Sequence, residues 1–101
     1  MDDDLAKELE QDRLERLAEL DTYRGEDDPD WQRRVLSDPY SFHEALHLAH
    51  VFGDTIERHL IEHPIVLLHP HLYALAAQAG MALAELYQAI GNVVPDEGPR
   101  G

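Results

Sequence analysis

The sequence predicts an all-α protein: an N-terminal acidic helix followed by an antiparallel helical hairpin, completed as a bundle by dimerisation. Apolar residues recur at helical spacing in three long segments, and proline or glycine separates these segments. No segment is rich in β-forming residues. A chain of 101 residues is expected to form one domain, here over 1–92, with a modest core. A second copy would therefore add stability.

The first helix is expected over residues 1–24. Leu5, Leu9, Leu17 and Leu20 share one face, while glutamate and arginine alternate along the rest with the spacing of ion pairs within a helix. An isolated helix of this kind is marginal in water. We therefore expect its leucine stripe to pack on the rest of the domain or on a second copy.

A loop and a short helical turn are expected over 25–38. Gly25 can close the first helix, and the acidic run with Pro29 cannot continue it. A turn starting after Asp30 would direct Trp31, the single tryptophan, to the edge of the core. The alternative role for Trp31 is an exposed anchor for a binding partner.

The second long helix is expected over 39–63, ending before Pro64. It has two candidate starts: Asp38 as N-cap with Pro39 in the first turn, or Ser41 and Glu44 as a capping box. Its predicted buried face follows an α-helical stripe. That face consists of Phe42, Ala45, Leu46, Ala49, Phe52, Gly53, Ile56 and Leu60.

An apolar connector over 64–69, read as a buried loop or single turn, leads to the third long helix over 70–91. The predicted core stripe of this helix is Leu72, Leu75, Ala76, Ala79, Ala82, Leu83, Leu86 and Ile90. Its opposite side is also largely apolar, and a helix that is apolar all round should be covered all round. We therefore expect a homodimer or partner interface formed by Tyr73, Ala77, Gly80, Met81, Ala84 and Tyr87. Residues 93–101 are expected to be a flexible tail.

The charge restricts the classes of partner. There are 21 acidic residues against 8 basic ones, a formal net charge of −13. This argues against direct binding of nucleic acid or an anionic membrane, because both require clustered lysine and arginine. It permits a basic protein partner or a cation, and the alternative interpretation is that the charge serves solubility. The absence of cysteine excludes thiolate metal sites, and the N-terminus does not have the pattern of a secretory signal, so a cytoplasmic protein is expected.

Histidines and carboxylates form a stripe on the second long helix. Its members are His43, His47, His50, Asp54 and Glu57. At about 100° per residue, all five fall within roughly 80° of one helix face. Imidazole and carboxylate ligands suit zinc or another divalent transition metal. The alternative interpretation is an exposed polar face, because one helix is too extended for all five residues to reach one ion.

The same helix contains an H-E-x-x-H string, from His43 to His47, which in zinc peptidases provides two ligands and a general base. The remaining signature of such enzymes is missing. The extended form would need Gly at 50 and His at 53, where the chain has His50 and Gly53, and the form with a distant glutamate has Val66 in its place. No β-rich segment is present to hold a peptide substrate. These departures argue against a peptidase.

The sequence therefore favours a small, non-enzymatic interaction or regulatory protein that acts by protein–protein binding. One version is an inhibitor that presents acidic surface to a basic target. No cofactor is expected in this interpretation. The competing hypothesis is a metal-binding helical protein that uses the histidine–carboxylate stripe.

Overall fold

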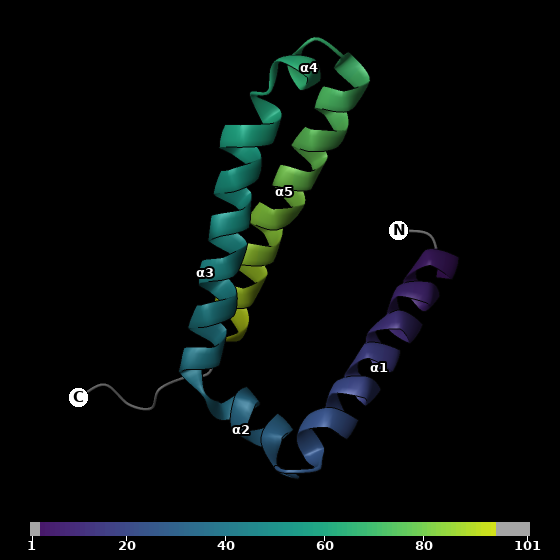
Figure 1. Cartoon of the computed structure of the whole chain (residues 1–101), viewed down its shortest axis with the longest axis vertical. Coiled ribbons are helices and arrows are strands. Elements are labelled where there is room, and N and C mark those ends of the chain that lie inside the picture. Colours follow the sequence, from purple (N-terminus) through teal and green to yellow (C-terminus); the bar gives the residue numbers. More distant parts are fainter. Residues whose placement is uncertain (1–2, 95–101) are drawn as a thin grey trace, which may run out of the picture. The chain divides into compact units, whose positions relative to one another are not determined.

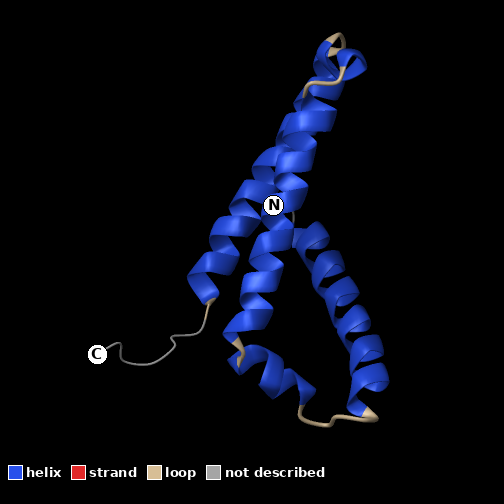
Figure 2. Ribbon diagram, turned by 60° about the vertical axis from the view of Figure 1, so that its left-hand side comes forward, coloured by secondary structure: helices blue, strands red, loops and turns tan. Residues whose placement is uncertain are grey.

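The computed structural model describes residues 3–94, which form helices and connecting turns without a strand (Figure 2). The elements are α1 (Asp3–Gly25), α2 (Trp31–Ser37), α3 (Pro39–Thr55), the π-helical segment η1 (Ile56–Ile61), α4 (Pro64–Leu67) and α5 (Pro70–Val93). The all-α prediction is confirmed. Most of the expected C-terminal tail, from residue 95, lies outside the described residues.

The chain divides into two compact units, with the boundary between Leu36 and Ser37. The sequence led us to expect a single domain over 1–92. Because the structure has two units, each is described by itself. None of the helices within residues 3–94 has the combination of length and apolar character needed to cross a membrane.

The first unit contains α1, a helix without a buried residue. Arg13 donates to Glu10 at 2.9 Å, and Arg16 donates to Asp12 at 3.0 Å, so ion pairs one turn apart support the helix. The hydrogen bond from Arg13 holds the pKa of Glu10 below its ordinary value. Within this unit the leucine stripe of α1 stays largely exposed, with Leu17 half-buried.

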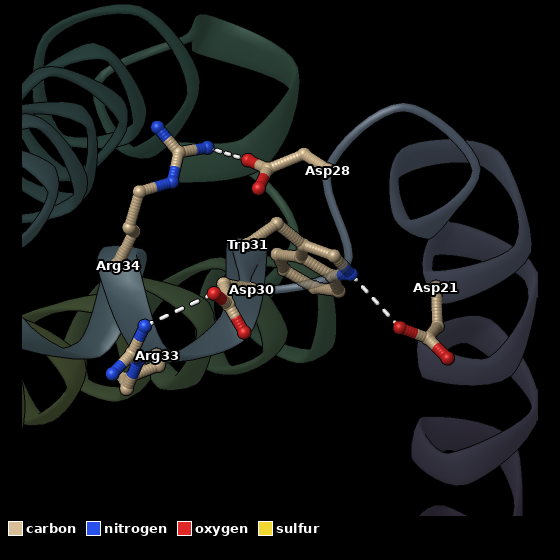
Figure 3. Close-up of polar contacts among 6 residues, drawn as sticks. All are labelled: Asp21, Asp28, Asp30, Trp31, Arg33 and Arg34. Carbon is tan, nitrogen blue, oxygen red and sulfur yellow. Dashed lines mark hydrogen bonds and ion pairs between the residues drawn. The ribbon is translucent and has the colours of Figure 1, made fainter.

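Trp31 is the buried residue of α2, with 5% of its surface exposed. Its indole Nε1 donates to a carboxylate oxygen of Asp21 at 2.9 Å (Figure 3). The guanidinium of Arg24 lies 5.5 Å from the centroid of the Trp31 ring. These contacts tie α2 to the last turns of α1. Ion pairs from Arg34 to Asp28 and from Arg33 to Asp30 fasten the turn before Trp31 (Figure 3). The expected burial of Trp31 is confirmed.

In the second unit α3 begins at Pro39, and Asp38 is its N-cap. The Asp38 carboxylate accepts from the backbone N–H of Tyr40 at 3.0 Å and from the Ser41 hydroxyl at 3.3 Å. Of the two starts considered, the Asp-Pro start is the correct one. The helix continues through η1 and ends at Ile61, two residues before the expected end.

The connector forms the single helical turn α4, in which Val66 is buried. His63 caps this turn, because its Nδ1 accepts from the backbone N–H of Ile65 at 3.1 Å. The ring of His69 lies 2.7 Å from the backbone oxygen of Ile65 and links α4 to the start of α5. Two histidines of the chain therefore have local structural roles around the proline-bounded connector.

Helices α3 and α5 run side by side in opposite directions (Figure 1). They meet through small residues. A Cβ placed on Gly53 would lie 3.8 Å from Leu83, and one on Gly80 would lie 3.4 Å from the tip of Ile61 and 3.8 Å from Ile56. Ala49 and Ala76 are the buried residues of the two helices. The two helices therefore approach closely where side chains are small or absent.

This packing corrects the expected core of α5. Ala76 is buried and Leu83 and Ile90 are half-buried, but Leu72, Leu75 and Leu86 are exposed. The contact face is turned away from the leucines toward Ala76, Ala77 and Gly80, since a face of small residues allows a closer approach than a face of leucines. On α3 and η1, likewise, Ala45, Phe52 and Leu60 of the predicted core face are exposed.

Close packing at Gly80 leads to the first prediction. Gly80→Leu should reduce the free energy of unfolding by about 1–3 kcal/mol, because the added side chain must displace Ile56 and Ile61. Gly91→Leu is the matched control, since nothing lies within 4 Å of a Cβ there and leucine favours a helix more than glycine. Urea unfolding of both variants checks this. Equal effects at the two positions would contradict close packing at Gly80.

The pair of Glu10 and Arg13 leads to the second prediction. The folded pKa of Glu10 is lowered, so the pair stabilises α1 at pH values above the unfolded pKa, and this stability is lost as the pH falls through the folded pKa. Arg13→Gln should raise the pKa of Glu10, measured by NMR titration of its carboxyl carbon. Arg16→Gln, which removes the neighbouring pair with Asp12, should leave the pKa of Glu10 unchanged. An unchanged pKa in the Arg13 variant would contradict the assignment.

Candidate interaction groove

A groove of about 560 Å³ runs along one flank of the α3–α5 pair. The second unit alone supplies its walls. From α3 and η1 the lining residues are Ala49, His50, Gly53, Asp54, Glu57 and Ile61. From α5 they are Tyr73, Ala77, Gly80, Met81, Leu83, Ala84, Tyr87 and Gln88.

The wall on α5 contains all six residues that the sequence analysis assigned to an interface. Met81 is exposed, and the two tyrosines, Tyr73 and Tyr87, are partly so. The role of Gly80 differs from the expectation. It lies against Ile56 and Ile61 of the same chain, which a Cβ at this position would contact at 3.8 Å and 3.4 Å.

The opposite wall carries the histidine and the carboxylates of the groove. His50, Asp54 and Glu57 belong to the predicted stripe and line the groove together. The ring of His50 lies 6.0 Å from the ring of Tyr87, centroid to centroid, with the planes tilted by 54°. Asp54 accepts from Arg58 at 3.1 Å, and both side chains are exposed. The wall is thus acidic, with one aromatic contact across to α5.

His43 and His47, the other two stripe residues, line a smaller pocket of about 260 Å³ together with Leu46, His50 and Tyr87. The five stripe residues are all exposed. Within residues 3–94 no three histidine or carboxylate side chains are placed to share one metal ion. The stripe therefore lies along one helix face, as its spacing indicates, but a single chain does not gather it into a metal centre.

The π-helical segment η1 affects the direction of the Glu57 side chain. In a π-helical segment hydrogen bonds skip one extra residue, so side chains beyond its start are rotated relative to an α-helix. Glu57 and Ile61 both lie in η1 and both line the groove. Five residues of the groove were not predicted as site residues: Ala49, Gly53, Ile61, Leu83 and Gln88. Ala49, Gly53 and Leu83 had been assigned to the core, and the periodicity of one helix does not reveal which residues of two helices share a groove.

No protein-family model, curated protein or solved structure gives a significant match to the chain. What the groove binds is therefore inferred from its own residues.

The geometry of the stripe leads to the third prediction. Tight transition-metal sites use three or more protein ligands, and here His43 and His47 offer at most an i,i+4 pair. We expect equimolar zinc, nickel or cobalt to leave the melting temperature of the protein, prepared without a His tag, unchanged. A rise that the double substitution His43→Ala with His47→Ala abolishes would establish the stripe as a site. A rise that survives this substitution would assign the metal to other histidines, such as His63 and His69.

Proposed function

We propose that this chain is a non-enzymatic interaction protein whose groove binds an amphipathic, positively charged helix of a partner protein. The observation that carries the proposal is the lining of the groove. An apolar wall with Tyr73, Met81 and Tyr87 faces an acidic wall with Asp54 and Glu57. A helix with one apolar face and basic flanks complements such a groove.

Apolar burial would supply the affinity of this complex. A groove of this size accepts a few large side chains projecting from one face of a helix, and the exposed surface of Met81 and the tyrosines is available to cover them. Aromatic residues and methionine are also the residue types enriched at the cores of interfaces. The small neighbours Ala77 and Ala84 leave space between these larger side chains.

Charge would supply selectivity and speed of association. The chain has a formal net charge of −13, and the groove adds Asp54 and Glu57 where the partner would lie. Complementary charge raises association rates and disfavours acidic competitors. A basic target is therefore favoured, and an inhibitor that covers such a target is one form that this function would take.

Several features support a binding role over catalysis. The chain has no cysteine, and its two serines, Ser37 and Ser41, lie at helix ends, where Ser41 donates to Asp38. Among the described residues no polar or charged residue is buried. The groove therefore lacks the buried, preorganised polar group that orients a small substrate.

The fourth prediction tests the groove with two model peptides. A fluorescent amphipathic helix of leucine and lysine should bind, whereas the same pattern of leucine and glutamate should not. Ala84→Arg fills the groove and repels the basic peptide, so it should weaken binding at least about tenfold, or about 1.4 kcal/mol. Ala74→Arg is the matched control, because Ala74 is exposed on α5 and does not line the groove.

Fluorescence anisotropy titrations of the two variants give the comparison, and raised salt should weaken the lysine complex. Equal binding to Ala84→Arg and Ala74→Arg would place the site elsewhere. Equal binding of the lysine and glutamate peptides would contradict the proposed contribution of charge to binding.

A further inference from the structure

A second apolar surface lies on the flank of the α3–α5 pair opposite the groove. On α5 it consists of Leu72, Leu75, Ala79, Ala82 and Leu86. On α3 it consists of Ala45, Leu48 and Phe52. All eight residues are exposed within the second unit. We call this set the leucine face.

Helical geometry places these residues together. The five members on α5 recur at intervals of three and four residues and lie within about 80° of one another around the helix axis. None of the eight residues lines the groove, which occupies the other flank of both helices. Since α3 and α5 contact each other between the two flanks, the leucine face is shared by both helices.

The exposure of this face is large for so small a unit. Leu75 is 50% exposed and Phe52 is 56% exposed. In the same unit the buried apolar residues are Ala49, Val66 and Ala76, and no large side chain within residues 3–94 is fully buried. A core of this size supplies little stability, and a contiguous exposed apolar face of this kind marks an interface.

We propose that the leucine face binds a second copy of this chain, with the two α5 helices antiparallel across a two-fold axis at Ala79. The charge distribution selects this occupant. Glu85 is the single charged residue between Pro70 and Val93, and helical spacing turns it away from the leucine face. Two copies that each carry a net charge of −13 repel elsewhere, but α5 brings no acidic group to this surface.

The order of large and small residues along α5 also suits contact with a second copy of this helix. Leu72 and Leu86 are equally far from Ala79 along α5, so an antiparallel pair places Leu72 against Leu86 of the partner subunit. Leu75 then lies near Ala82 and Leu83 of the partner subunit, and small residues occupy the axis. Large side chains at the ends and alanines in the centre allow close packing over the whole contact.

This proposal goes beyond the binding of a basic partner, because it uses the other flank and leaves the groove open. Sedimentation equilibrium of the wild-type chain should give twice 11.5 kDa. The groove variant Ala84→Arg should keep this dimer, so failure of peptide binding and failure of dimerisation are separable. A wild-type chain that stays monomeric at high concentration would overturn the proposal.

Introduced cysteines test the axis, and the chain offers a background free of native cysteine. Ala79→Cys should form an intermolecular disulfide under mild oxidation, because only residues at the two-fold axis lie close to their own equivalents. Ala74→Cys, also an exposed alanine of α5, should not. A dimer in which the Ala74 variant cross-links as readily as the Ala79 variant would overturn the placement of the axis.

The direction of the helices has its own test. A mixture of Leu72→Cys and Leu86→Cys chains should cross-link mainly between the two variants, as antiparallel pairing requires. Cross-linking of each variant mainly with itself would indicate parallel helices and would overturn the proposed arrangement.

Discussion

The close approach of α3 and α5 at two glycines is the constraint on which the second unit depends. A Cβ added at Gly53 would already be in van der Waals contact with Leu83, and one added at Gly80 would be in contact with Ile56 and Ile61. A side chain much larger than alanine at either position would have to displace these neighbours. That packing fixes which face of each helix is turned inward.

The orientation of the contact face determines both remaining surfaces. When α5 turns Ala76, Ala77 and Gly80 toward α3, one flank carries Leu72, Leu75 and Leu86, and the other carries Met81 and Ala84. The polar stripe of α3 then falls beside the second flank, so acidic groups face the groove, and α5 brings none to the leucine face. The proposed basic partner and the proposed second copy would therefore use different flanks of the same two helices.

The parts of the fold that were predictable from the sequence are those set by local chemistry. Asp38 followed by Pro39 was one of the two helix starts considered, and the structure uses it. Pro64 and Pro70 mark the limits of the connector, because proline fixes its own backbone and lacks a donor. The contact face of α5 was not predictable in this way. Its alanine face and its leucine face are both apolar, so periodicity alone could not choose between them. The π-helical turn at η1 likewise has no local signal that distinguishes it from an α-helix.

In the candidate site, too, the sequence predicts the arrangement of residues along one helix but not their neighbours on the other helix. The spacing of His43 through Glu57 correctly places these residues along one face, but at 1.5 Å per residue they extend over about 21 Å of helix axis. A single ion cannot span that length, whereas an elongated ligand such as a helix can contact several of them in turn. His50, Asp54 and Glu57 are therefore better placed to form one edge of a groove than to coordinate one metal ion. Their position beside Tyr87 and Met81, which only the packing of α5 reveals, is what joins the polar stripe and the predicted interface into one surface.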